Sequence, residues 1–252
     1  MEASLARRAL AELVGTMLLV AVVVGSGIAA QRLSPGDVGL QLFENAAATA
    51  AGLIAIILAV GPVSGAHLNP VVSAADRIFG GLTNRDLGVY VVAQVVGASL
   101  GCMLANLMYS LPAVDWSTHT RSSGALWLSE AVATAGLLLV IFGVVRSGRG
   151  SVAPFAVGAY IGAAYFFTSS TSFANPAVTI GRMFSNTFAG IDPTSVAAFI
   201  AFQIVGAALA VGLVRLLYPD IAHDLPDLIV AHHDGENGER VDVDASDRRS
   251  NG

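Results

Sequence analysis

The chain has 252 residues, of which 54% are hydrophobic and only 12% are charged, and its mean hydropathy is +0.68. Soluble domains carry about 25% charged residues, so this composition excludes an ordinary soluble enzyme and indicates an integral membrane protein. The formal net charge is −5 and the 13 basic residues are all arginine, which gives no basic surface for nucleic acid. The single cysteine, Cys102, excludes an internal disulfide and a cysteine-based metal cluster.

Six windows are long and apolar enough to cross a bilayer, since a membrane helix needs about 20 mostly apolar residues. They cover residues 9–30, 40–61, 87–109, 125–145, 152–170 and 195–217. The first window follows two arginines, as the apolar part of a signal peptide would. Its length and the five spans after it instead predict a helix of the mature protein.

Arginines near the span ends predict the orientation of the chain in the membrane. If the N-terminus is cytoplasmic, seven arginines fall on the cytoplasmic side (Arg7, Arg8, Arg77, Arg85, Arg146, Arg149 and Arg215) and three on the other (Arg32, Arg121 and Arg182). Cytoplasmic loops carry the excess of positive charge. We therefore predict a multi-pass protein of the cell membrane with both termini in the cytoplasm.

Residues 219–252 form a polar, acidic tail. Half of the 18 acidic residues of the chain lie in it: Asp220, Asp224, Asp227, Asp234, Glu236, Glu239, Asp242, Asp244 and Asp247. Such a composition cannot bury enough apolar area to fold alone, which predicts a disordered cytoplasmic tail. Its His223, His232 and His233 could bind a metal, but a solvated tail is the simpler interpretation.

The body of the chain, residues 1–218, contains an internal repeat, with halves at about 1–112 and 122–218. Three segments recur in the same order, and their polar residues align as Glu12 with Glu130, Asn69 with Asn175, and Gln94 with Gln203. Each half contains three spans, and because three is odd the second half is inverted relative to the first. Inverted repeats are typical of transporters and channels whose site lies near the midplane. The fold class predicted is an all-α membrane protein with an inverted 3+3 repeat.

An Asn-Pro pair follows the second span of each half. Asparagine at the N-cap with proline at the first helical position is a strong helix start. Each helix is expected to be about 11 residues long and to rise ~16 Å, about half of a ~30 Å bilayer core. We predict two re-entrant half-helices that meet at the pore centre through Asn69, Pro70, Val71 and Asn175, Pro176, Ala177. Their two positive dipole ends would repel cations and protons.

Two glutamates, Glu12 and Glu130, lie inside apolar spans, where a charged side chain is costly. We expect each to accept hydrogen bonds from the backbone of a re-entrant loop. A proton relay is the alternative, although nothing basic in the spans would complete it. His67 either lines the cytoplasmic vestibule or bonds loop carbonyls.

Several further residues suit contacts between helices. Gln94 and Gln203 are expected to form hydrogen bonds across helices. Four glycines are expected to permit close helix packing: Gly97, Gly101, Gly206 and Gly212.

These motifs resemble the aquaporin, or major intrinsic protein, family. The resemblance covers about residues 8–218 and rests on AELVGT at 11–16, SGAHLNPV at 64–71, SFANPAVT at 172–179 and the paired Glu and Gln residues. It implies six tilted helices plus two half-helices, and a pore in each subunit of a homotetramer in the lipid bilayer. It also implies passive flux of water or small uncharged solutes, with no catalysis, no cofactor and no metal.

The chain departs from the family pattern at the pore. The first Asn-Pro-Ala triplet of the family ends here in Val71, which should be tolerated. The family usually has an arginine directly after the second triplet, where this chain has Val178. The resemblance places the remaining positions of this selectivity filter at Thr49, Ala163 and Ser172. A shift by one residue would replace Ala163 by Gly162, and a larger slip would bring in aromatic side chains from Tyr160, Tyr165, Phe166 and Phe167.

This small filter without its arginine predicts solutes larger than water: glycerol-like polyols, urea, or neutral metalloid hydroxides such as arsenous acid. The second triplet resembles that of a bacterial, arsenic-linked branch of aquaglyceroporins. Arg182, one turn beyond Val178, could lean back into the outer vestibule, but a snorkelling surface side chain is the simpler interpretation. The alternatives are a water-selective channel narrowed by aromatics of the fifth span, and a proton-coupled transporter that uses Glu12 and Glu130.

Overall fold

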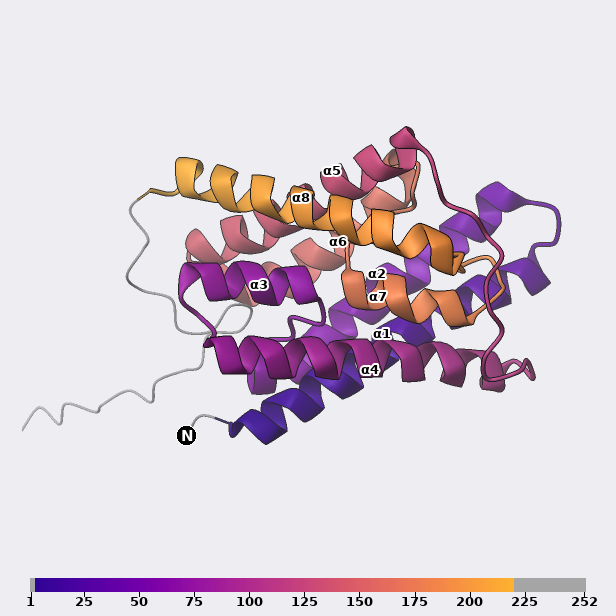
Figure 1. Ribbon diagram of the computed structural model, residues 1–252, viewed down its shortest axis with the longest axis horizontal. Helices are drawn as coiled ribbons and strands as arrows, with labels where there is room; N and C mark the ends of the chain where they lie inside the picture. Colours follow the sequence, from indigo (N-terminus) through magenta and orange to yellow (C-terminus); the bar gives the residue numbers. More distant parts are fainter. Residues whose placement is uncertain (1–2, 220–252) are drawn as a thin grey trace, which may run out of the picture.

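The computed structural model describes residues 3–219, and this part of the chain is a bundle of helices (Figure 1). Six segments have the length and apolar composition to cross a membrane. Their helices are α1 Leu5–Leu33, α2 Val38–Ser64, α4 Asn84–Met108, α5 Gly124–Arg146, α6 Ala153–Phe167, which is preceded by the 3-10 turn η1 Gly150–Val152, and α8 Pro193–Leu217. Each predicted window overlaps one of these helices, so the predicted fold class is confirmed. The predicted tail, with its three histidines, lies outside the described residues except for Pro219.

Side chains cap five of the long helices at their N-termini. The caps are Ser4, Asp37, Thr83, Ser123 and Asp192, and each accepts a hydrogen bond from a backbone N–H of the first turn. The first N–H groups of a helix have no partner within the helix, and these side chains supply one. The sequence therefore fixes where these helices begin.

Two shorter helices lie inside the bundle (Figure 1). They are α3 Pro70–Phe79 and α7 Pro176–Gly181, and each begins at an Asn-Pro pair. The helix α7 is shorter than the expected length because it passes into the 3-10 turn η2 Arg182–Phe184. There the carbonyl of Arg182 accepts a hydrogen bond from the backbone N–H of Ile191, so the chain turns aside from the helix.

The N-terminus and the end of α8 lie at the same end of the bundle, which we call the terminal face; the other end is the opposite face (Figure 1). From the centre, α3 runs toward the terminal face and α7 toward the opposite face. The two half-helices therefore enter from opposite sides, as the inverted repeat requires.

Close backbone contacts repeat between the two halves. A Cβ atom added to Gly97 of α4 would lie 2.3 Å from the carbonyl oxygen of Leu13 in α1, and one added to Gly206 of α8 would lie 2.3 Å from that of Ala131 in α5. Glycine is needed at both positions because any side chain would strike the neighbouring backbone. Gly101 makes a similar approach to α1, but a Cβ on Gly212 would meet nothing within 4 Å, so the prediction for Gly212 is wrong.

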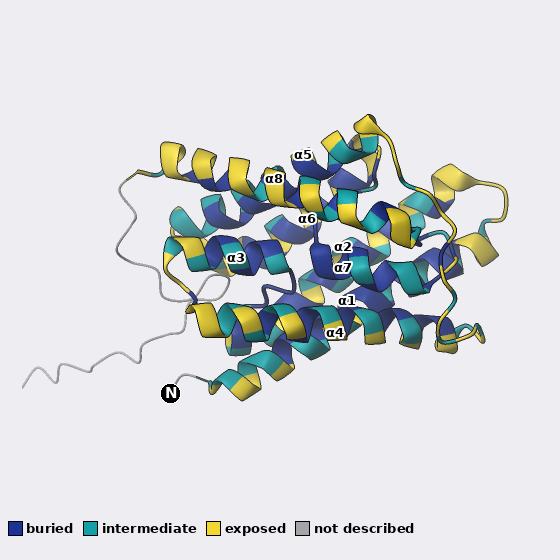
Figure 2. Cartoon of the chain, in the orientation of Figure 1, coloured by how far each residue is buried: buried dark blue, intermediate teal, exposed yellow. Residues whose placement is uncertain are grey.

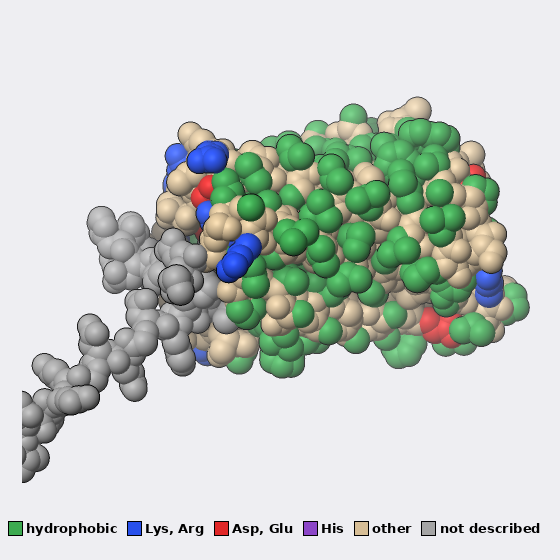
Figure 3. Space-filling view, turned by 90° about the horizontal axis from the view of Figure 1, so that it is seen from below, with side chains coloured by type: hydrophobic (Ala, Val, Ile, Leu, Met, Phe, Trp, Pro, Cys, Tyr) green, Lys and Arg blue, Asp and Glu red, His purple; other side chains and the backbone are tan. Residues whose placement is uncertain are grey.

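The outer surface of the bundle is apolar. Yellow and teal segments of the long helices face outward in Figure 2, while α3 and α7 are largely buried. On the face shown in Figure 3, hydrophobic side chains cover the middle and the charged side chains gather at the two ends. Large apolar side chains point outward, among them Leu10, Phe43, Leu128, Leu209 and Leu216. Such a belt between polar ends is what a bilayer requires of a spanning protein.

Candidate functional site at the meeting of the half-helices

The two Asn-Pro segments hold each other at the centre of the bundle. Nδ2 of Asn69 donates to the carbonyl of Ala174 at 2.8 Å, and Nδ2 of Asn175 donates to the carbonyl of Leu68, also at 2.8 Å. Each Oδ1 accepts from the first turn of its own half-helix, at Val71 N and Ala177 N respectively. Each asparagine therefore caps one half-helix and ties it to the loop before the other.

The loops that lead to these asparagines have an uncommon backbone. Non-glycine residues adopt positive φ at matching places in the two halves: 47° at Ala66 and 52° at Ser172, 52° at Leu68 and 48° at Ala174. Such conformations are costly and persist only where the surroundings impose them. The matching angles show that the repeat extends to the backbone of the loops.

In the first half, hydrogen bonds to Glu12 hold the loop backbone in this conformation. One carboxylate oxygen accepts from the backbone N–H of His67 at 3.0 Å and from the hydroxyl of Ser64 at 2.7 Å. The other accepts from the N–H of Leu68 at 2.7 Å and from Nε2 of Gln94 at 2.8 Å. Glu12 is fully buried, and all four of these donors come from the loop or from the helices beside it.

Glu130 does the same in the second half. It accepts from the N–H groups of Phe173 and Ala174, both at 2.9 Å, and from Nε2 of Gln203 at 2.6 Å. Neither Glu12 nor Glu130 lines the cavity between the half-helices. A proton relay would need a titrating group on the solute path, so this geometry favours the role of loop support.

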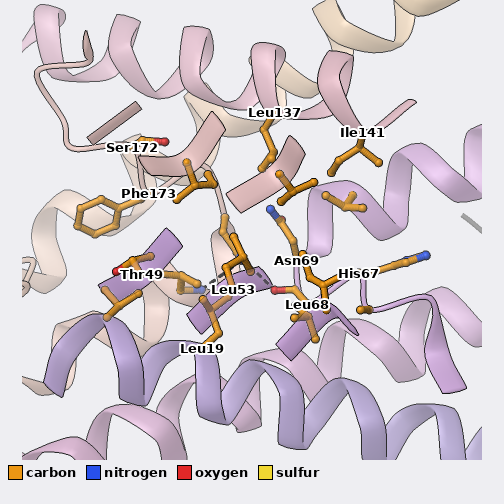
Figure 4. Close-up of a pocket in the computed structure, with 18 of the residues that line it drawn as sticks. Leu19, Thr49, Leu53, His67, Leu68, Asn69, Leu137, Ile141, Ser172 and Phe173 are labelled. Atoms are coloured by element: carbon orange, nitrogen blue, oxygen red, sulfur yellow. Dashed lines mark hydrogen bonds between the residues drawn. The ribbon is translucent and has the colours of Figure 1, made fainter. Parts of the chain in front are cut away.

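A cavity lined by both asparagines lies at the meeting of the half-helices, and Figure 4 shows it around Asn69. The space open to the centres of water-sized molecules is ≈ 60 Å³, several times the ~10–15 Å³ that one water needs. Ser172, Phe173 and Thr49 gather at one end of the view in Figure 4 and His67 at the other, with Asn69 between them. Apolar side chains complete the wall, including Leu19, Leu53, Ile57, Leu137 and Ile141. The wall of the path therefore combines polar and apolar side chains.

Only part of the predicted pore-centre set borders this cavity. Asn69 and Asn175 line it, and so does Val72. The other members of the two triplets, Pro70, Val71, Pro176 and Ala177, do not line it. Val71 and Ala177 pack in the hydrophobic core, which explains how valine can stand in the first triplet.

The prediction for the fifth span is wrong. Ala163 is exposed and does not line the cavity, whereas Ile161 and Tyr165 do. Residues four apart share a helix face and a residue midway between them points away from it. The Tyr165 hydroxyl lies 3.1 Å from Oγ1 of Thr49, so the cavity is narrower at this level than a small residue would leave it.

The other fifth-span residues face elsewhere. Gly162 does not line the cavity, and the Tyr160 hydroxyl donates to the carbonyl of Ala133. Phe166 and Phe167 are exposed. The helix α6 is apolar on all sides, so its sequence carries no periodicity that would reveal the inward face.

Of the two interpretations of Arg182, the snorkelling surface side chain is wrong, and the structure agrees with the alternative that it reaches the vestibule. It is only 2% exposed and lines the cavity near Val178 and Ser172. Its Nε donates to the carbonyl of Ala189, and its guanidinium carbon lies 3.4 Å from the centre of the Phe173 ring. The structure therefore brings an arginine to this end of the cavity although Val178 occupies the position next to the triplet.

His67 lines the other end of the cavity and is buried. Its Nδ1 lies 3.0 Å from Oγ of Ser73 and its Nε2 lies 4.0 Å from a carboxylate oxygen of Asp76. The histidine thus contacts side chains of α3 and lines the cavity. Of the two expectations for His67, the vestibule position agrees with the structure and the bonds to loop carbonyls do not. Among residues 3–219 no group of three or more His, Cys, Asp or Glu side chains could hold a metal ion.

Comparison with known proteins agrees with this architecture. The family model described as Major intrinsic protein matches residues 1–172. The chain is 50% identical to aquaglyceroporin AqpS of Rhizobium meliloti, with 86% of this chain and 92% of that protein covered. It is 34% identical to the glycerol uptake facilitator protein of Pseudomonas aeruginosa, with 88% and 91% covered.

A solved structure shares the fold. The aquaglyceroporin from Plasmodium falciparum superposes with a TM-score of 0.64 at 22% identity, over 86% of this chain and 97% of that one. The family match, the related sequences and the crossed asparagine loops agree with one another. The chain belongs to the major intrinsic protein family, and it is accordingly a membrane channel for small neutral solutes and not an enzyme.

Proposed function

We propose that the protein conducts glycerol-like polyols and water passively across the membrane. The observation that carries this proposal is the mixed polar and apolar lining of the cavity. The polar side chains of Asn69, Asn175 and Thr49 line it together with aliphatic side chains of α1, α2 and α5. A polyol combines the same two kinds of group, because its hydroxyl groups need hydrogen-bond partners and its carbon chain does not.

The relatives support the same class of solute. Two of them carry the names aquaglyceroporin and glycerol uptake facilitator. Arsenous acid, a neutral hydroxide with comparable hydrogen-bonding groups, is the second solute in the proposal. Flux of a neutral solute through such a path follows its gradient and needs no energy coupling.

The proposal includes the setting of the channel. Residues 1–218 form the channel domain, residues 219–252 form a tail, and both termini lie in the cytoplasm. Seven arginines at the cytoplasmic span ends against three at the other ends support this orientation. The protein acts as a homotetramer in the cell membrane, an arrangement implied by the family.

Reconstitution into liposomes tests the proposed solute. Stopped-flow light scattering would follow water efflux in a sucrose gradient and re-swelling in a glycerol gradient, each against empty vesicles. We expect fast re-swelling in glycerol, and a reduced rate in Val178→Arg, because the longer side chain would enter the cavity beside Ser172. Val71→Ala is the matched control, since Val71 packs in the core and should leave the ratio of glycerol to water flux unchanged.

The alternatives give different results. Fast water efflux without glycerol entry would contradict the polyol proposal and indicate a water-selective channel narrowed by Tyr165. Solute uptake that depends on an imposed pH gradient, and that is lost in Glu130→Gln, would indicate the proton-coupled transporter. If glycerol enters, arsenous acid uptake is measured next in the same vesicles.

A further inference from the structure

Arg182 is a buried cation inside the membrane-spanning part of the chain. Within residues 3–219, the ion pairs in the structure are Arg8 with Asp86 and His67 with Asp76, and Arg182 belongs to neither. A charged side chain at this depth is costly unless it is paired or faces a cavity that holds water. Arg182 lines the channel cavity, which is the second of these conditions.

The guanidinium group is held in one orientation. Its Nε donates to the carbonyl of Ala189, and its face lies over the ring of Phe173. Phe173 is itself fixed, because its backbone N–H donates to Glu130 and its ring packs edge-on against Phe199 at 5.1 Å between centres. These contacts use one nitrogen and one face of the guanidinium.

The two terminal nitrogens are left for a solute. In the described part of the chain they donate no hydrogen bond, and neither is sealed from the cavity. A fixed guanidinium whose two terminal nitrogens donate no hydrogen bond within residues 3–219 therefore lines the cavity at the mouth of the channel on the opposite face.

We propose that Arg182 is the cationic specificity residue of this mouth, where it donates hydrogen bonds to the hydroxyl oxygens of a neutral polyol and repels cations and hydronium. Val178 has no side-chain hydrogen-bond donor, and Arg182, one helical turn further along the chain, supplies one in its place. This inference rests on the proposed function, since a solute must pass the mouth for its selectivity to matter. A fixed charge beside a narrow path of low dielectric raises the barrier to ions of its own sign and leaves neutral solutes free to pass.

The inverted repeat does not impose this charge. The offset of 106 residues that relates Asn69 to Asn175 relates Asp76 to Arg182. Asp76 lies on α3 beside His67, toward the terminal face. The two half-helices therefore carry side chains of opposite sign at equivalent positions, and only Arg182 lines the cavity.

A merely structural role for Arg182 would be to hold the loop between η2 and α8. Arg121 already holds that loop: its Nε donates to the carbonyl of Gly190 at 2.9 Å and its Nη2 donates to that of Phe188 at 3.3 Å. Its guanidinium also lies near Phe173, at 5.1 Å from the ring centre. Arg121 does not line the cavity, so it is the matched control for a cation that supports the loop without facing the solute.

The test compares proton leak and glycerol entry in proteoliposomes. Wild type, Arg182→Met, Arg182→Lys and Arg121→Met would be reconstituted, with a trapped pH-sensitive dye to follow proton entry under an imposed pH gradient. We expect Arg182→Met to raise the proton leak about tenfold, equivalent to ~1.4 kcal/mol in the barrier. Arg182→Lys should keep the charge and the low leak but change the ratio of glycerol to water flux. Arg121→Met should leave the leak at the wild-type level.

A rescue variant separates charge from loop support. Arg182→Met combined with Val178→Arg returns an arginine to the mouth without restoring the contact with Ala189, and we expect it to lower the leak again. The inference is overturned if Arg182→Met matches wild type in both assays, or if Arg121→Met raises the leak equally. Should Arg182→Met fail to insert, a high leak in Arg182→Lys overturns the inference, whereas a low leak in both Arg182→Lys and the rescue variant supports it.

The outcome for wild type keeps the two proposals apart. If wild-type vesicles admit no glycerol, the proposed function fails before the role of Arg182 is tested. If they admit glycerol and the Arg182 variants do not differ from wild type, only this inference fails.

Discussion

The two re-entrant segments are alike at the centre of the membrane and different at their mouths. At the centre, both halves use an asparagine cap, a glutamate under the loop and a glutamine beside it, and these groups make equivalent hydrogen bonds. At the mouths, α3 continues for 10 residues and carries Asp76 near His67, whereas α7 ends after 6 residues and Arg182 turns into the cavity. The shared part holds the two half-helices in place, and the part that differs brings Arg182 to the cavity in one half only.

The largest effect is expected from loss of a loop-supporting glutamate. In Glu12→Ala or Glu130→Ala, two buried backbone N–H groups and a glutamine amide lose their acceptor, at ~1–3 kcal/mol for each group. Both variants should therefore lose channel activity and melt at much lower temperature. The melting temperature is measured by thermal unfolding in detergent, and the channel activity by glycerol flux into proteoliposomes. Equal losses would confirm that the two halves are equivalent at the centre, and a stable, active Glu130→Ala would contradict the role given to that carboxylate.

The second-largest effect is expected from substitution of Gly97 and Gly206, the glycines at the close helix contacts. Gly97→Leu and Gly206→Leu would force α1 from α4 and α5 from α8, because the new Cβ atoms meet backbone oxygens. Overpacking typically lowers the free energy of unfolding by ~1–3 kcal/mol. We expect a loss near the upper limit of this range here, because a backbone carbonyl cannot move aside as a side chain can. Gly212→Leu is the control, since that position is open, and its melting temperature should not change. If Gly212→Leu destabilised the protein as strongly, the close contacts would not be the cause.

A smaller effect is expected at the mouth. Tyr165→Ala removes the ring that approaches Thr49 and should raise glycerol flux a few-fold more than water flux, since the larger solute gains more from a wider path. Ala163→Leu is the matched control because residue 163 faces away from the cavity. Stopped-flow measurement of both solutes would decide between the two positions. A response from Ala163→Leu and none from Tyr165→Ala would restore the register first expected for this span.

The smallest effect concerns a cap outside the membrane. Hydrogen bonds from Thr194 lower the pKa of Asp192 below its usual value of 3.8. A carboxylate with a lowered pKa in the folded state stabilises the fold above its unfolded pKa, and the contribution is lost as the pH falls through the lowered value. Asp192→Asn should therefore make the melting temperature slightly less sensitive to acid. Melting curves of wild type and Asp192→Asn on either side of that pKa would show a difference, and identical pH dependence would contradict it.

Much of the fold could be predicted because the bilayer limits the choices. A span must be long, apolar and helical, so hydropathy alone located all six. The repeated Glu, Asn and Gln residues stood out because polar groups are rare in such spans. The Asn-Pro pairs marked the starts of both half-helices, since proline fits the first helical position and asparagine caps it.

Side-chain direction was decided by tertiary structure. Nothing in the apolar sequence of α6 distinguishes the face of Tyr165 from the face of Ala163, so only packing against α2 and α5 sets which one meets the cavity. Arg182 could not be placed from its sequence position either, because the helix gives way there to a 3-10 turn and the side chain is held by Phe173 and Ala189. By itself the sequence determined the spans, the repeat and the caps, which depend on local composition and spacing. The composition of the channel mouth depends on contacts between residues far apart in the chain, and these exist only once the helices have packed.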